Sequence, residues 1–257
     1  MKNYFIIALL ALLVATGCGS HNVEDSLRSA AEVADSVAKA DAGGSVVVDV
    51  PNLQISFTVT DSEISLASVG QDLFEVFAAQ QLKKVSPKVV AKVVEALRES
   101  KGELDVIINS DNGESAAFTL TPHRIVALQR AKNSELNFSS ARTQVIAVAE
   151  RMVPAPQEHI GAMKVHVSVS KSFLEYNIVW PNVTSYERQP QGILTKRYFN
   201  ALKEQYQTMG GLAEPVIDML TSMGIDGVRI VYSAENSDKE LKQAFPWREI
   251  RLPIEKE

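Results

Sequence analysis

The chain has 257 residues, 46% of which are hydrophobic, and carries a formal net charge of −5 at pH 7. This composition is that of a globular protein with enough apolar side chains for a core. The acidic charge argues against a nucleic-acid partner, which would need a basic surface. The only cysteine, Cys18, leaves no second thiol for a disulfide, so stability has to come from the hydrophobic core.

The first predicted element is a hydrophobic segment, residues 4–15, which follows Lys2 and contains no charged side chain. Its 12 residues are too few to cross a bilayer, since a membrane-spanning helix needs about 20 apolar residues. The segment fits the apolar part of a secretory signal, which lies between a positive residue and small residues such as Thr16 and Gly17. We therefore expect residues 1–17 to be a cleaved signal peptide.

The end of this signal, Ala15-Thr16-Gly17-Cys18, resembles the lipobox of bacterial lipoproteins, with Ala15 where leucine is usual. The resemblance implies cleavage before Cys18, a diacylglycerol on its thiol and an acyl chain such as palmitate on its amino group. Two or three acyl chains make a stable anchor, at about 0.8 kcal/mol per buried CH₂. The resemblance also implies the cell envelope, and Gly19, where inner-membrane lipoproteins commonly have aspartate, favours the outer membrane. The alternative is an ordinary signal peptide with a cysteine nearby by chance.

Residues 18–45 are expected to connect the lipid to the folded body. Most of this segment, residues 22–42, is polar and rich in alanine, and Gly43-Gly44 follows it. Apolar side chains recur on one side of the helix that it would form, as the spacing of Leu27, Ala30, Ala34 and Val37 shows. We expect a helical spacer, either free of the body or weakly docked on it.

The body of the chain contains two similar stretches, which predict an internal duplication rather than chance similarity. The matching segments are 53–61 with 174–182, 104–110 with 228–234, and 121–128 with 245–252. The first pair is 121 positions apart and the other two are 124 apart, which requires one small insertion. We predict a first repeat at 46–130, a helical linker at 131–162 and a second repeat at 163–257.

Each repeat is predicted to contain strands, then two helices, then strands. Turn residues such as Pro51-Asn52 and Asn112-Gly113 separate the strands, and Ser86-Pro87 starts a helix. The expected elements of the first repeat are strands 45–50 and 53–59, helices 71–84 and 87–100, and strands 104–108 and 115–121.

The second repeat begins with a strand in which valines alternate with polar residues, the pattern of a sheet with one buried face. Its expected elements are strands 163–170 and 173–180, helices 191–209 and 212–223, and a strand at 228–232. The linker has a predicted helix at 141–153, whose apolar side chains would pack against one repeat. The fold class is therefore α+β, with two tandem copies of the unit and helices on one face of mainly antiparallel sheets.

The sequence contains no motif of a known enzyme class: no nucleophile elbow, zinc-protease helix, phosphate loop or dinucleotide fingerprint. The four histidines, His21, His123, His159 and His166, occur singly, so we expect neither a metal ion nor a cofactor. Two arginines, Arg124 and Arg248, recur in register between the repeats. They are either twin anion sites or, as we favour, structural clamps that bind backbone carbonyls.

Tyrosine and tryptophan are confined to the second repeat once the signal peptide is removed. Their large apolar faces and polar tips suit half-wet interfaces, so we single out Tyr186, Tyr198 and Trp247 as a candidate binding patch. The alternative is that the second repeat has a bulkier core.

These observations predict a lipid-anchored bacterial envelope protein with a non-enzymatic binding or assembly role. It would contact the membrane through the lipid on Cys18 and bind an envelope protein or a small ligand, but no nucleic acid. The alternative is an envelope hydrolase with its active site in the cleft between the repeats. A shallow apolar face with a polar rim would favour the binding protein, and a deep cleft with converging acids or histidines would favour the enzyme.

Overall fold

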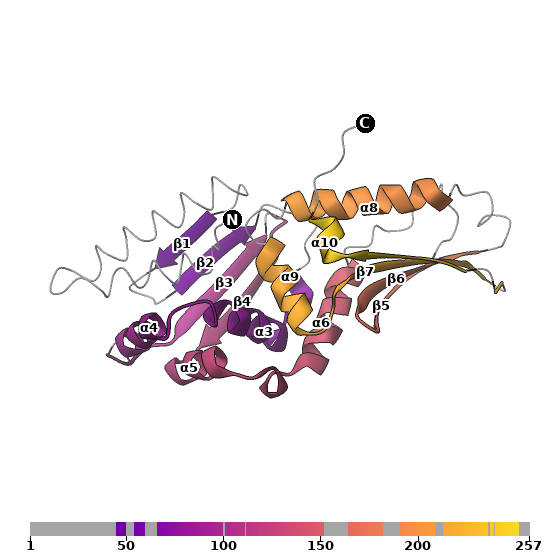
Figure 1. The fold of residues 1–257 in the computed structure, drawn as a ribbon. Helices are drawn as coiled ribbons and strands as arrows, with labels where there is room; N and C mark the ends of the chain where they lie inside the picture. The colour runs from indigo at the N-terminus through magenta and orange to yellow at the C-terminus, as the bar shows by residue number, and fades with distance from the viewer. Residues whose placement is uncertain are drawn as a thin grey trace.

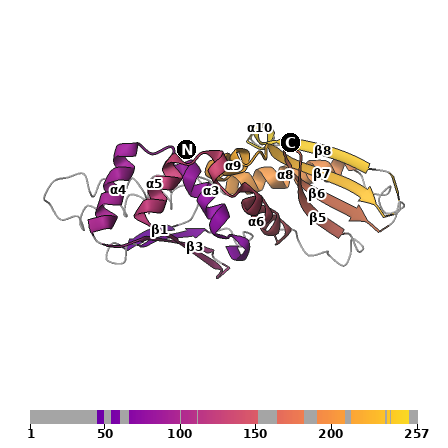
Figure 2. The same cartoon turned by 90° about the horizontal axis from the view of Figure 1, so that it is seen from below.

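The structure, a computed structural model, describes residues 45–49, 54–59, 66–99, 101–110, 112–151, 164–181, 191–208, 213–235, 237–238 and 240–251. The predicted signal peptide, Cys18 and the spacer up to residue 44 lie outside the described residues. The described part is a mixed α/β fold with two mainly antiparallel sheets of four strands each (Figure 1). The sheets lie at opposite ends of the molecule, with helices between them (Figures 1 and 2).

The first sheet has the strand order β1-β2-β3-β4, in which the central pair is parallel and both outer pairs are antiparallel. Its strands are β1 (Ser45–Asp49), β2 (Gln54–Val59), β3 (Leu104–Ser110) and β4 (Ser115–Leu120). A parallel pair needs a long crossover connection. Here η1 (Leu66–Ser68) and two helices, α3 (Gln71–Leu82) and α4 (Pro87–Glu99), provide it, and α5 (Pro122–Arg130) follows the last strand.

The second sheet has the order β5-β6-β7-β8, and again only its central pair is parallel. Its strands are β5 (Lys164–Ser170), β6 (Phe173–Trp180), β7 (Gly227–Ala234) and β8 (Glu240–Pro246). The crossover from β6 to β7 contains α8 (Gln191–Thr208) and α9 (Ala213–Ser222), and α10 (Trp247–Ile250) follows the last strand. The chain between the sheets contains η2 (Asn133–Glu135) and α6 (Phe138–Arg151).

Helices cover one face of each sheet, because alternate residues of the strands are apolar. In the first sheet, α3, α4 and α5 lie on the same side (Figure 2), and the ring of Phe74 on α3 stacks on Phe118 of β4, with centroids 4.2 Å apart. In the second sheet α8 occupies this place, and Phe199 stacks on Phe245 of β8, with centroids 4.6 Å apart.

Helix α9 lies where the two halves of the chain meet. It packs against α3, and Met219, Leu220 and Met223, which follows the helix, belong to a hydrophobic cluster that contains residues of both sheets. The linker helix α6 packs against both α3 and β5, and Val145 and Ala149 of its predicted apolar side are buried. The larger core therefore contains residues from both halves of the chain.

The sheet registers correct one detail of the sequence comparison. Leu104 pairs with Leu120, whereas Val228, the predicted counterpart of Leu104, pairs with Phe245. Five residues separate the last paired positions of the first hairpin (109 and 115) and six those of the second (233 and 240). The second hairpin is thus one residue longer, and the offset beyond it becomes 125.

With this offset Pro122 corresponds to Trp247, and both residues begin a helix. Arg124 then corresponds to Glu249 rather than to Arg248. The predicted equivalences of Pro122 with Pro246 and of Arg124 with Arg248 are therefore wrong by one residue.

Candidate functional site

The structure describes only part of the predicted site. Cys18, Tyr186, His21 and His159 lie outside the described residues, and Tyr198 belongs to α8 but its side chain is not described. His123 and His166 are exposed on α5 and β5. Within the described ranges there is no cluster of three or more His, Cys, Asp or Glu residues that could hold a metal ion. None of the helices described is both long and apolar enough to span a membrane.

Trp247 has a structural role at the start of α10. Its indole Nε1 donates a hydrogen bond to the carbonyl oxygen of Ile225 at 2.7 Å, and its backbone N–H donates to the backbone carbonyl oxygen of Asp226 at 3.0 Å. The half-buried ring packs against both hydrophobic clusters. Two other aromatic residues, Tyr176 and Trp180, lie on the covered face of β6, so these three side chains contribute to the core.

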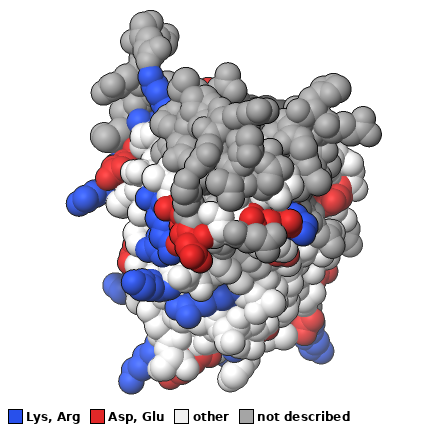
Figure 3. Space-filling model, turned by 90° about the vertical axis from the view of Figure 1, so that its right-hand side faces the viewer, with Lys and Arg blue, Asp and Glu red and all other residues white. Residues whose placement is uncertain are grey.

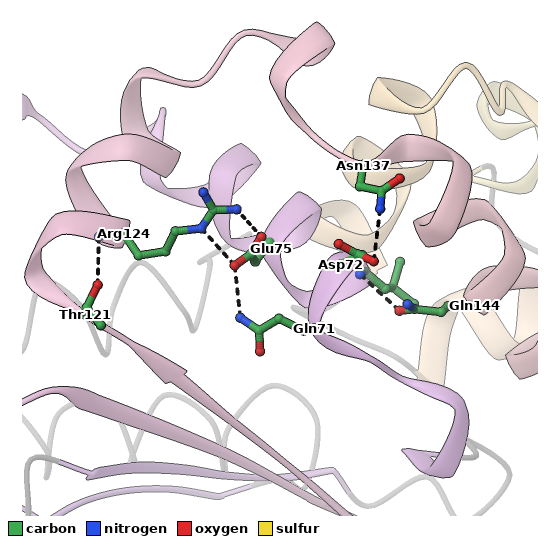
Figure 4. A network of polar contacts seen from close by, with 8 residues as sticks. Gln71, Asp72, Glu75, Thr121, Arg124, Asn137 and Gln144 are labelled. Carbon is green, nitrogen blue, oxygen red and sulfur yellow. Dashed lines mark hydrogen bonds and ion pairs between the residues drawn. The ribbon is translucent and has the colours of Figure 1, made fainter.

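Arg124 fastens α5 to α3 (Figure 4). Its Nε donates to Glu75 Oε1 at 2.8 Å, a second guanidinium N–H donates to Glu75 Oε2, and Gln71 also donates to Oε1 at 3.0 Å. Burial raises the pKa of Glu75, but the hydrogen bonds from Arg124 and Gln71 outweigh burial and hold this pKa below its ordinary value. Arg124 is therefore a clamp, but its partner is a carboxylate rather than the predicted backbone carbonyls.

A second clamp joins α8, α9 and the residue after α10. Arg251 donates to both carboxylate oxygens of Glu214, at 2.9 and 2.6 Å, and the hydroxyl of Tyr206 donates to Oε1 at 2.6 Å. Burial raises the pKa of Glu214, but the hydrogen bonds from Tyr206 and Arg251 outweigh burial and lower it. Burial and the bond to Glu214 raise the pKa of Tyr206 to about 12. The carboxylate stays ionised and the tyrosine stays protonated, as a structural ion pair requires.

Alkaline pH should destabilise the fold through Tyr176. Burial raises the pKa of this tyrosine from 10.0 to about 12, so between these values the folded state holds a proton that the unfolded state has lost. Stability is therefore lost as the pH rises from 10 to 12, by about 3 kcal/mol. Urea unfolding across this pH range measures the loss. In Tyr176→Phe the loss should shrink to that of the remaining tyrosines, and an unchanged pH dependence would contradict the assignment.

The face of the first sheet opposite the helices has an apolar centre and a polar rim. Alternation along the strands and the registers of the strand pairs place one residue of each strand in a central row: Val47, Ser56, Ile107 and Ala117. Val47 is 57% exposed and is the one exposed large hydrophobic side chain among the residues described. Ala117 is also exposed, and Ile107 is half-buried. We call the residues of this row and its two neighbouring rows the outer face.

Polar side chains flank the central row of the outer face on both sides. One flanking row is uncharged and includes Thr58, Asn109 and Ser115; the other consists of Asp49, Gln54, Asp105 and Thr119. The hydroxyl of Thr119 donates to Asp105 at 2.7 Å, and Gln54 donates to Ser56 at 3.0 Å. The charged residues of these rows are Asp49 and Asp105, and Asp105 is exposed.

The corresponding face of the second sheet has a different character. The row that corresponds to the apolar centre contains His166, Asn177, Val231 and Lys242. Next to it Arg229 donates to Glu175 at 3.0 Å and lies over the ring of Phe173, 4.5 Å from its centroid. Basic and acidic side chains are interspersed at this end of the molecule (Figure 3). The two sheets thus share a topology but present different surfaces.

The apolar centre was not found from the sequence, because its four residues come from four strands and join only through the sheet registers. The available signal was an apolar residue at an outward-facing position of β3 and of β4. These residues are Ile107 and Ala117, and the second sheet has Val231 and Lys242 at the corresponding positions. No protein-family model, curated protein or solved structure matches the chain. The fold and the outer face alone define the class of molecule: a two-sheet α/β protein with one open, weakly apolar face.

Proposed function

We propose that this chain is a lipid-anchored bacterial envelope protein that binds another protein through the outer face of the first sheet. The observation that carries the proposal is the exposed central row of Val47 and Ala117 with Ile107 between polar rows. An exposed apolar patch rimmed by polar groups is typical of a protein-binding surface. The sequence before residue 45, with its signal and Cys18, supports anchoring at the envelope, with the outer membrane favoured.

We also propose that the two halves descend from one duplicated strand–strand–helix–helix–strand–strand unit. The same strand order and the same parallel central pair support it. The sequence offsets support it too: the pairing of Ile55 with Val106 becomes that of Tyr176 with Ile230 when the predicted offsets of 121 and 124 are added. A duplicated scaffold would allow one outer face to acquire binding while the other stayed charged.

Charge complementarity indicates the chemistry of the partner. Because Asp105 is an exposed carboxylate of the outer face, a partner with an apolar side chain flanked by lysine or arginine would complement it. Two copies of this face placed against each other would bring aspartates together. We therefore propose a basic partner protein rather than a second copy of the chain.

The described carboxylates near the junction of the halves favour binding over hydrolysis. Glu214 is bound by Arg251, and Asp218 forms an ion pair with Lys84, which follows α3. General acid–base catalysis needs a carboxyl group that can reach a substrate with a pKa near the working pH, and the pKa of Glu214 is lowered. These groups hold helices together, so we propose no catalytic role.

Photo-crosslinking tests the proposed surface. A photoreactive amino acid at position 47 or 117 of the membrane-anchored protein should form an adduct with the same basic protein. The matched controls are positions 166 and 242, which occupy the corresponding row of the second sheet and should form no such adduct. Val47→Asp should abolish co-purification of that partner without changing the thermal stability, because Val47 is exposed.

Three results would overturn the proposed surface: adducts only from positions 166 and 242, no adduct from either face, or an adduct with a second copy of the chain. Adducts from position 47 that resist protease and carry a small mass would identify a small ligand instead. Each of these outcomes is independent of whether Cys18 carries lipid.

A further inference from the structure

Helix α6 lies between two halves of the chain, which are the described residues before 131 and those after 163. It packs on α3 on one side and on β5 on the other, and the figures show it between the two sheets, beside α3 and α9 (Figures 1 and 2). Two of its polar side chains, Arg142 and Gln144, are two positions apart and therefore point in different directions around the helix.

Gln144 caps the start of α3 in the first half. Its side-chain oxygen accepts hydrogen bonds from the backbone N–H groups of Gly70 at 3.0 Å and Leu73 at 3.1 Å (Figure 4). The first N–H groups of a helix have no partner within the helix, and Gly70, the N-cap residue, has no side chain to supply one. A Cβ on Gly70 would lie 2.9 Å from the side chain of Gln144, so the glycine also makes room for the cap.

Arg142 caps the end of α9 in the second half. Its Nε donates to the carbonyl oxygen of Met223 at 2.9 Å, and a second guanidinium nitrogen donates to the same oxygen. The helix ends there at Gly224, which has a φ of 77°. A cation at the carboxyl end of a helix is favourable, as is an acceptor at the amino end. Helix α6 therefore supplies a hydrogen-bond acceptor to the start of α3 and a cationic donor to the end of α9.

Direct contacts between the halves act together with these caps. Met219 and Leu220 of α9 and Met223, which follows it, lie in the same hydrophobic cluster as Leu73 and Val76 of α3. Lys84, two residues beyond α3, forms an ion pair with Asp218 of α9. If one half unfolded alone, it would expose this shared core and leave a cap of α6 without its partner.

We propose that α6 is a two-sided clamp that makes the two halves unfold as one cooperative unit. Loss of the cap on either side should weaken both halves by the same amount, because neither half keeps its core without the other. The two predicted repeats are then not independent folding domains, and any ligand that stabilises one sheet stabilises the other through α6.

The test is urea unfolding of Gln144→Ala with one probe in each half. Both tryptophans, Trp180 and Trp247, are in the second half, so fluorescence reports there; hydrogen exchange of the β3 amides reports on the first half. We expect both probes to show the same shift, a roughly fivefold higher unfolded fraction, because a lost N-cap costs about 1 kcal/mol. Arg142→Ala removes the opposite cap and should likewise move both probes together.

Thr143→Ala is the matched control, since the hydroxyl of Thr143 bonds to Ser139 within α6 and the side chain is exposed; it should shift neither probe. Gln144→Glu keeps an acceptor at the helix start and should stay near wild type, which keeps the test open if the alanine variant fails to fold. A shift of the exchange probe alone in Gln144→Ala, or of fluorescence alone in Arg142→Ala, would overturn the proposal.

Discussion

Replacing Gly227 with alanine should destabilise the protein by about 3 kcal/mol. Gly227 is the buried first residue of β7 and pairs with Pro246 of β8. A Cβ there would lie 2.8 Å from the Cα of Pro246 and closer still to the carbonyl oxygen of Phe245. These are backbone atoms that cannot rotate away, so β8 would have to move and carry Trp247 with it. Urea unfolding followed by tryptophan fluorescence measures the effect.

Gly113→Ala is the comparison that separates crowding from backbone strain. Gly113 has a φ of 87° but no atom within 4 Å of the position that a Cβ would occupy. Alanine there should cost only the strain of the left-handed conformation, about 1 kcal/mol. A smaller loss for Gly227→Ala than for Gly113→Ala would show that β8 moves easily, and the close approach at Gly227 would then have no structural importance.

The periodicity of the sequence predicted most elements because their apolar residues follow one face. The helices predicted from 71 and 87 begin at those residues, and the strand with alternating valines is β5. Strand β8 was missed because it is an edge strand with exposed Glu240, Lys242 and Gln243, which remove the alternation. Charged side chains are common on edge strands. Helix α5 is not predicted either, because its nine residues are too few for a clear helical period.

The long-range contacts could not be predicted, because local spacing does not specify which helix packs where. Both α4 and α9 are amphipathic second helices, yet α4 packs on α5 whereas α9 packs on α3 in the other half of the chain. The same limit applies to Arg124, whose partner Glu75 is 49 positions away. The sequence indicated a structural arginine but contained no signal for the carboxylate that it binds.

The candidate surface could not be predicted from local spacing either. Val47, Ser56, Ile107 and Ala117 are unremarkable one by one, and only the registers of three strand pairs place them in one row. The aromatic residues attracted notice in the sequence because of their composition, but Trp247 packs between the two hydrophobic clusters. Large side chains are often buried, so an unusual composition alone does not distinguish a binding surface from a core.

Cys18→Ala should abolish the lipid anchor, so that no mature, lipidated protein remains in the membrane fraction. The proposed anchor depends on one thiol, since Cys18 is the only cysteine, and without it neither diacylglycerol nor the later amino-terminal acyl chain can be attached. The variant should accumulate as an unprocessed precursor or as a soluble envelope protein, with a folded body. Membrane fractionation and intact-mass measurement check this, since the wild type should begin at Cys18 and carry added acyl mass.

Ala15→Leu is the control for this experiment, because it restores the residue that is usual in the lipobox and should leave cleavage and lipidation intact. If the wild type begins at any residue other than Cys18, the segment is an ordinary signal peptide and the anchor does not exist. If Cys18→Ala stays in the membrane fraction at the wild-type level although intact mass shows that its signal is cleaved, the body itself binds the membrane or a membrane protein. The Val47→Asp variant in the Cys18→Ala background separates these two cases, since it should release the protein only if the outer face holds it there.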